Sequence, residues 1–410
     1  MLRLLPSFAS SIVMAFLAVA MEPITIVAQS ETTKAKSEVW VLHYWDEAHQ
    51  LVTTVTGKSW LPLSSQWFLG VKGLTEWIRL AEEEHAVAHP MDHTDHTNHT
   101  DMNNDPGGGT MGDVDAVSGA SIQGHSHKGL GEARGEGSLS LRRIWAGSNP
   151  GSLGASFRYS GESDFHSGML TLNGSREFFQ RNTALSGYVG AGMDYSNPTE
   201  SPPGQRGLWP ANSGRLAASV QVGQLLSPRI QVGMSYAISY LEGMLENPYR
   251  RARVITTLFP EQLPETRVRH VFGAEIGSYM GYGVALFHRE GAYFDSWGVR
   301  SWIPETGLPI EVGKRWLLTP KHKYYYQLPA SFYKTAYSKS DYQLEKDLAG
   351  DVRLGHLEGN DYSLTIEYSL RAETNASSLS LSGTYFDFVN LSGQTKMKSY
   401  VVAMGWKSPV

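Results

Sequence analysis

The chain has 410 residues, a net charge of −5, 42 glycines and no cysteine. The lack of cysteine excludes a disulfide framework, a thiolate metal site, a catalytic cysteine and a lipid-modified N-terminal cysteine. Mean hydropathy is −0.28, and beyond the N-terminus no stretch approaches the roughly 20 apolar residues of a membrane helix. A membrane β-barrel escapes that requirement because only every second residue of its strands faces lipid.

The first 28 residues predict a cleaved secretory signal peptide. Arg3 supplies the positive charge at its start, an apolar core runs from Phe8 to Met21, and Ala28 is the small residue before the expected cut. That core is too short to span a membrane comfortably, which disfavours a permanent anchor. We expect residues 29–37 to be a short linker and residues 38–406 to form one domain.

Alternation of large apolar residues with small or polar residues recurs along that domain. Near the C-terminus, Tyr400, Val402, Met404 and Trp406 are each separated by one smaller residue. Successive side chains of a strand point to opposite faces, so such a run predicts a strand with one apolar face. Each run is about as long as a tilted membrane strand, roughly 9 to 11 residues. Further runs of this kind cover residues 185–195, 215–223, 229–240 and 362–371.

Short and long connections alternate between these runs. Tight turns are expected at residues 149–151, 226–228 and 358–361, and long polar loops at 81–136, 196–213, 242–266 and 328–340. Outer-membrane barrels have short periplasmic turns and long extracellular loops. The sequence therefore predicts an all-β fold, an antiparallel transmembrane β-barrel of about 16 strands (range 12–16), with both termini in the periplasm. Residues 378–388 fit either a membrane strand or an extracellular excursion.

Aromatic and charged residues on these strands predict two surfaces. Aromatic girdles at the membrane interfaces are the expected role for part of the set Trp40, Tyr44, Trp45, Trp60, Trp67, Trp77 and Tyr324 to Tyr326. Charges at alternate strand positions must face water or a partner rather than lipid. The candidates for a pore lining are Arg215, Arg229, Glu275, Arg300, Glu367 and Arg371. They would either set the selectivity of a pore or pair across a closed interior.

Four short motifs resemble one protein family. They are Asp-Ala-Val-Ser-Gly-Ala-Ser at 115–121, Asn-Pro-Tyr-Arg-Arg at 247–251, Asp-Ser-Trp-Gly-Val-Arg-Ser at 295–301 and Ala-Ser-Phe-Tyr at 330–333. In this order they resemble the outer-membrane β-barrel family filed as domain-of-unknown-function family 3570, over roughly residues 38–406. The resemblance implies a bacterial outer-membrane barrel and no established activity, because the family is uncharacterised. The chain departs from the family in its long histidine-rich segment before the first motif.

That segment holds half of the 14 histidines in the chain. Residues 81–136 carry eleven acidic and two basic residues, and we expect a long, disordered extracellular loop there. Imidazole and carboxylate groups are ligands for zinc, copper or nickel ions. The candidate metal ligands are His85, His89, His93, His96, His99, Asp92, Asp95 and Asp101. The alternative is an inert solvated loop, because neither the three-residue repeat nor the glycine-rich run after it would hold metal ligands in a fixed geometry.

A second charged cluster lies at or beside the loop 242–266. It comprises Arg250, Arg251, Arg253, Arg267, Arg269 and His270. Such a cluster could bind lipopolysaccharide phosphates or guide anionic solutes. The alternative, which we favour, is a loop whose arginines are neutralised by Glu242, Glu246, Glu261 and Glu265.

Three functions fit these features, and a porin-like channel for small solutes, with metal ions gathered by the histidine-rich loop, is the leading hypothesis. The alternatives are a closed barrel that serves as scaffold or receptor for a periplasmic or surface partner, and an outer-membrane enzyme. We expect no enzyme, because no Gly-x-Ser-x-Gly elbow and no phosphate loop occur in the sequence. No cofactor is required, although the loop would bind zinc, copper or nickel loosely. The expected partners are outer-membrane lipid and lipopolysaccharide, the barrel-assembly machinery, and small solutes or metal ions, with no nucleic acid.

Overall fold

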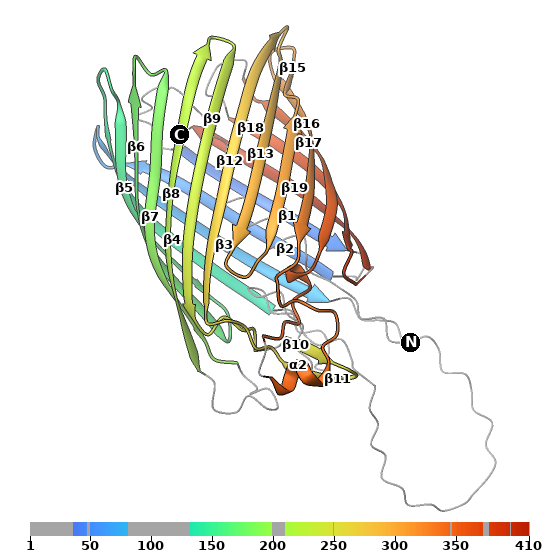
Figure 1. The fold of residues 1–410 in the computed structure, drawn as a ribbon. Helices are drawn as coiled ribbons and strands as arrows, with labels where there is room; N and C mark the ends of the chain where they lie inside the picture. The colour runs from blue at the N-terminus through green and yellow to red at the C-terminus, as the bar shows by residue number, and fades with distance from the viewer. Residues whose placement is uncertain are drawn as a thin grey trace, which may run out of the picture.

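The computed structural model describes residues 36–46, 50–80, 132–198, 210–248, 250–344, 347–371, 377–393 and 395–409. The predicted signal peptide, the linker up to residue 35 and most of the histidine-rich segment lie outside these residues. Within them, the helices are too short or too polar to cross a membrane. The described chain is almost entirely antiparallel β-sheet (Figure 1).

Nine consecutive strands make up the first part of the sheet. They are β1 (Lys36–Asp46), β2 (Gln50–Pro62), β3 (Trp67–Leu80), β4 (Glu132–Trp145), β5 (Gly151–Gly161), β6 (Phe165–Phe178), β7 (Thr183–Ser196), β8 (Ala211–Ser227) and β9 (Ile230–Gly243). The second part comprises β12 (Thr266–Gly281), β13 (Val284–Asp295), β14 (Arg300–Gly307), β15 (Ile310–Val312), β16 (Trp316–Leu328), β17 (Leu357–Ser369), β18 (Ser378–Asn390) and β19 (Thr395–Pro409). Residues 378–388, which the sequence left as either a membrane strand or an extracellular excursion, therefore belong to a barrel strand, β18.

The sheet closes on itself. Strand β1 pairs antiparallel with β19 from Lys36 opposite Pro409 to Asp46 opposite Ser399. Strands β14 and β15 share one position in the ring, because both lie between β13 and β16. The 17 strands of the sheet thus form a closed barrel of sixteen positions, which confirms the predicted fold class. Closure leaves no unpaired edge strand, as a barrel in a membrane requires.

The outer face of the barrel is apolar. Along β7, for example, Leu185, Val189 and Met193 are exposed on the outside, separated by small or polar residues. Exposed leucine and valine side chains continue around the ring on the neighbouring strands. A band of this kind would be unfavourable in water and is suited to lipid.

Outward-facing aromatic and histidine rings contact one another between neighbouring strands. Trp45 stacks on Tyr400 with 5.6 Å between ring centroids, and Tyr400 packs on Tyr385. Similar contacts join Tyr159 to His166 and His166 to Tyr195. These rings form aromatic contacts on the outer face, and Trp45 among them belongs to the predicted girdle.

Part of the predicted girdle faces inward instead. Trp45, Trp67 and Trp77 are on the outer face, as expected. Trp40, Tyr44, Trp60 and Tyr325 occupy the opposite phase of their strands and lie on the lumenal face. Aromatic content alone does not determine which face of a strand a ring occupies, because adjacent positions point in opposite directions.

Both ends of the chain's β-structure lie at one end of the barrel, since β1 and β19 are antiparallel neighbours. The short connections 146–150 and 228–229 are at this terminus-bearing end, as predicted. The long connections 197–210, 244–265 and 329–356 are at the opposite, loop-bearing end. The predicted turn at 358–361 is wrong, because these residues lie inside β17 and pair with β16 and β18.

Two of the long connections fold together as a cap at the loop-bearing end (Figure 1). Its elements are the hairpin β10 (Arg251–Val254) and β11 (Thr257–Pro260), the helix α2 (Lys339–Gln343) and the 3-10 turn η1 (Val352–Leu354). Ala252, Val254, Tyr337 and Leu348 form its buried core. The expectation of polar loops at 242–266 and 328–340 is therefore corrected to a structured cap with its own apolar core.

Candidate functional site in the lumen and beneath the cap

Ion pairs line the lumenal face of β3, β4 and β5. Glu136 forms ion pairs with Lys72 at 3.3 Å, with Arg134 at 3.3 Å and with Arg158 at 3.4 Å. Its own side chain is almost fully buried. Arg134 also reaches Glu76, at 3.7 Å. Because three cations surround one buried carboxylate while the Lys72 side chain is 45% exposed, this wall presents positive charge to the lumen.

A second chain of ion pairs crosses β12, β13, β14, β16 and β17. Arg289 donates to Glu275 at 3.1 Å and to Glu305 at 2.8 Å. Lys323 lies 3.9 Å from Glu305 and 3.5 Å from Asp361. These residues share the inward phase of their strands, so both signs of charge are distributed around the lumen.

The six candidate pore-lining residues divide into two groups. Arg215 is inward and pairs with Asp194 at 2.8 Å. Glu275 is inward, and Glu367 pairs with Lys407 at 3.7 Å.

The other three candidates lie elsewhere. Arg300 lies on the exposed outer face of β14, in phase with Trp302 and opposite the outward-facing Phe294 of β13. Arg229 is in the exposed β8–β9 turn, and Arg371 follows β17 at the terminus-bearing end. The lumenal residues that sequence reasoning missed, such as Lys72 and Arg289, could have been found from their phase relative to outward leucines and phenylalanines.

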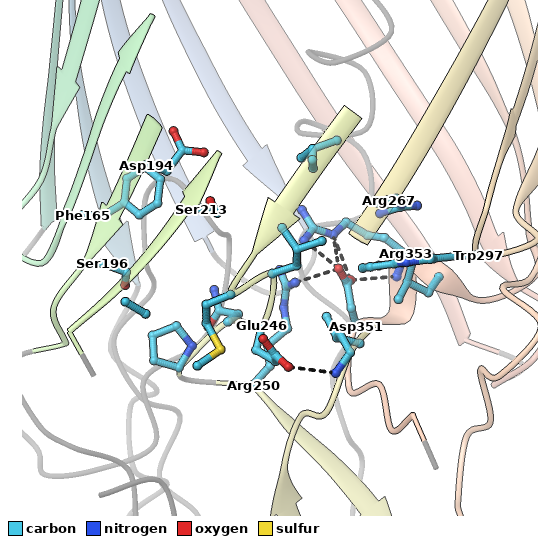
Figure 2. A pocket seen from close by; sticks show the side chains of 18 of the residues that line it. Phe165, Asp194, Ser196, Ser213, Glu246, Arg250, Arg267, Trp297, Asp351 and Arg353 are labelled. Carbon is cyan, nitrogen blue, oxygen red and sulfur yellow. Dashed lines mark hydrogen bonds and ion pairs between the residues drawn. The ribbon is translucent and has the colours of Figure 1, made fainter. Parts of the chain in front are cut away.

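A pocket of about 230 Å³ separates the barrel wall from the cap (Figure 2). Phe165, Asp194 and Ser213 line it from β6, β7 and β8, whereas Arg250 and Arg353 reach it from the cap. Its walls therefore come from segments almost 190 residues apart in the sequence.

Three of the four motifs that carry the family resemblance meet around this pocket. Asp295 accepts hydrogen bonds from the backbone N–H groups of Trp297 and Val299, both at 3.0 Å, and so fixes the β13–β14 turn. Trp297 packs with Ala330 in a buried cluster, and Asn247 lines the pocket nearby. The first motif, at 115–121, lies outside the described residues. The motifs thus build the junction between wall and cap.

Arginine–carboxylate pairs hold this junction together. Asp351 accepts from Arg250 at 2.7 Å and from Arg353 at 2.7 Å. Burial alone would raise the pKa of Asp351, but these two guanidinium groups hold it well below its usual range. Arg267 donates through Nε to Asp295 at 2.8 Å and lies over the Trp297 ring. Within the basic cluster, Arg250 thus pairs with Asp351 and Arg267 with Asp295, two aspartates that the sequence prediction did not name. Of the four predicted glutamates, Glu261 interacts electrostatically with Arg250 and Arg251.

Glu261 joins the two loops of the cap. Its carboxylate is buried and accepts from the backbone N–H of Gly350 at 2.7 Å and of Asn247 at 3.4 Å. Burial raises the pKa of Glu261 to about 7, against a lowering influence of Arg250 and a smaller raising influence of Asp351. The group therefore titrates near neutral pH.

The candidate metal ligands between His85 and Asp101 lie outside the described residues. Across the strands and cap that the structure does describe, no three His, Asp or Glu side chains form a group that could hold a metal ion.

The closed ring, its apolar outer band and its charged interior define a 16-position antiparallel β-barrel of the outer-membrane type. The chain belongs to the family described as "Protein of unknown function (DUF3570)", whose model matches residues 6–386. This confirms the resemblance seen in the motifs. No curated protein matches the sequence.

Solved structures with a similar fold are barrels of several kinds. A bacterial polysaccharide outer membrane secretin aligns with a TM-score of 0.49 and 8% identity, over 92% of this chain and 99% of the other. A ferric enterobactin receptor (PfeA) mutant from Pseudomonas aeruginosa aligns at 0.42 and 11% identity, over 87% and 53%. The chain therefore spans about half the length of that receptor. The CymD monoaromatic hydrocarbon channel aligns at 0.39 and 9% identity, over 92% and 88%.

Proposed function

We propose that the protein is a passive outer-membrane channel for small water-soluble solutes. The observation that carries the proposal is the exposure of charged side chains on the inner face of a closed barrel. Lys58, Lys72 and Lys407 remain 52%, 45% and 40% exposed there. A packed interior would bury these ammonium groups at high cost, so their exposure implies water in the lumen. Barrels of 16 to 18 strands are wide enough to leave an aqueous channel.

The orientation follows from the two ends of the barrel. The terminus-bearing end has the short turns and would face the periplasm, and the loop-bearing end with the cap would face outside. Solutes would then meet the pocket beneath the cap before they enter the lumen. Because most lumenal charges are paired, we expect only weak discrimination between small anions and cations.

The cap also supports a second function, a closed barrel that acts as receptor or scaffold. A cap with its own apolar core, anchored by Asp351 and Glu261, could block passage and present a surface to a partner. We rank the receptor or scaffold function second because a water-filled lumen explains the exposed lysines better than a blocked lumen does. We also propose that the protein is not an enzyme.

Swelling of proteoliposomes tests the proposal. Liposomes that contain the refolded barrel should swell in an isotonic pentose solution, and more slowly in solutions of larger sugars, because the pocket restricts entry. The protein must first be shown to be a folded barrel in detergent. If liposomes with this folded protein then swell no faster than protein-free liposomes, the result would favour the receptor. Reproducible co-purification of a second protein would then support that alternative.

Divalent metal ions are a finer part of the same proposal. The acidic, histidine-rich segment would raise their concentration near the channel. Zinc added to the intact protein should alter its conductance, and zinc added to a variant lacking residues 85–101 should not. An equal response in both would remove metals from the proposal.

A further inference from the structure

Two tryptophans lie on the lumenal wall near the terminus-bearing end. On β1, Val39 and Val41 are exposed on the outer face, so Trp40 between them points inward. On β2, Leu61 is exposed outside, and the preceding Trp60 points inward. Both residues are half-buried.

Each indole lies flat on a glycine of the neighbouring strand. Trp60 covers Gly70, where an added methyl group would meet three adjacent ring carbons at 2.7, 2.9 and 3.0 Å. Near-equal distances to adjacent ring atoms mean that the ring face, not its edge, lies against the glycine. Trp40 covers Gly405 in the same way. One face of each ring is therefore against the wall and the opposite face is turned toward the lumen.

The two rings lie over β19 and β3, with β1 and β2 between these strands, and an exposed lysine accompanies each ring: Lys407 on β19 and Lys58 on β2, two residues before Trp60. Glu38 lies opposite Lys58 on β2 and opposite Lys407 on β19. Lys58 pairs with Glu38 at 3.1 Å, and Lys407 pairs with Glu367 at 3.7 Å. The Lys407 ammonium is also 5.8 Å from the centre of the Trp40 ring. Because exposed ion pairs contribute little free energy, either lysine can turn to an incoming anion at small cost.

This arrangement matches a solute with a flat apolar ring and an acidic group. A ring stacks on an indole face, and a carboxylate replaces a glutamate as the partner of a lysine. We propose that Trp40 with Lys407, and Trp60 with Lys58, form the two halves of a binding site for aromatic carboxylates on the lumenal wall, each half able to hold one solute. The site deepens the proposed channel function by naming a substrate class, and it rests on that function for the route by which solutes arrive.

Benzoate is the probe, with acetate and benzyl alcohol as the charge-only and ring-only comparisons. Isothermal titration with the full-length folded barrel in detergent should show that benzoate binds more tightly than either comparison. Trp40→Ala and Trp60→Ala should each weaken benzoate binding at their own half of the site by up to about tenfold, as expected for the loss of one aromatic contact. Lys58→Gln together with Lys407→Gln should abolish the preference for benzoate over benzyl alcohol. Trp77→Ala, on the outer face, is the matched control and should leave binding unchanged.

The same proteins in planar bilayers separate this site from the channel itself. Benzoate should interrupt the open-channel current of the wild type and of Trp77→Ala, and do so less in Trp40→Ala. Benzoate binding by a barrel that conducts no current would contradict the channel proposal and still support the binding site. Current through a barrel that binds benzoate no better than acetate, or equally well in all variants, would overturn the site. If Trp40→Ala does not fold, the variant with both Lys58→Gln and Lys407→Gln tests the site by the same two measurements, benzoate affinity and interruption of the current.

Discussion

Glu261 joins two long loops through one buried carboxylate. Its two backbone partners, Gly350 and Asn247, belong to different connections of the cap. Burial raises its pKa from 4.5 to about 7. The folded cap therefore binds this proton more tightly than the opened cap does. The contribution to cap stability is complete below about pH 4.5 and is lost as pH rises through 7, by at most about 3 kcal/mol.

Hydrogen exchange across the pH range tests this residue. After correction for intrinsic exchange rates, protection of the amides of Gly350 and Asn247 should fall between pH 5 and pH 8 in the wild type. In Glu261→Gln, which keeps the shape of the side chain but cannot ionise, protection should not change with pH. Tyr333 and Tyr337 titrate far above this window, since burial raises the pKa of both. An identical pH dependence in the variant would show that another group is responsible.

At the scale of elements, contacts between aromatic rings and glycines shape the lumenal wall. The Phe388 ring of β18 lies over Gly359 of β17, and the Phe287 ring of β13 lies over Gly307 of β14. Phe388 joins Tyr325 and Leu357 in a buried cluster. These glycines are needed for the space they leave, because their backbone geometry is that of ordinary strand.

Two glycine substitutions in adjacent strands test this role. Gly359→Ala should displace the Phe388 ring and destabilise the barrel by about 1 to 3 kcal/mol, as overpacking does. Gly383→Ala is the control, because an added methyl group there meets nothing within 4 Å. It should be neutral or slightly stabilising. Urea unfolding in lipid, followed by the shift of the folded band on a gel, measures both, and equal effects would contradict the account.

Alternation in the sequence predicted the strands well where one face is apolar throughout. Strands β7, β8, β9, β17 and β19 were expected from such runs, with boundaries that differ by one to five residues. The count of about 16 strands along the sequence also agrees with the sixteen positions of the closed barrel. These features depend on local periodicity, which a single sequence contains.

Features that depend on distant contacts were missed. Residues 358–361 have turn composition, yet Gly359 is required under Phe388, and Asp361 faces Lys323 in the lumen. The cap core joins Val254 to Tyr337, more than 80 residues apart, so no local pattern reveals it. Arg300, predicted in the lumen, lies opposite the outward-facing Phe294 of β13, so the alternation of β13 carried through the turn would have placed it outside.

The whole molecule combines a barrel with an apolar exterior, a charged lumen and a folded cap at one mouth (Figure 1). The three parts differ in what stabilises them. The wall depends on strand pairing, the lumen on ion pairs, and the cap on two small apolar clusters together with Asp351 and Glu261. A channel requires that the cap narrow the entrance without sealing it.

Single-channel conductance of the refolded full-length protein in planar bilayers tests that requirement most directly. A water-filled lumen predicts stepwise, sustained current in potassium chloride, with little preference for either ion because the lumenal charges are paired. A persistently silent bilayer, from protein shown to be inserted and folded, would contradict the account and leave a barrel closed by its cap.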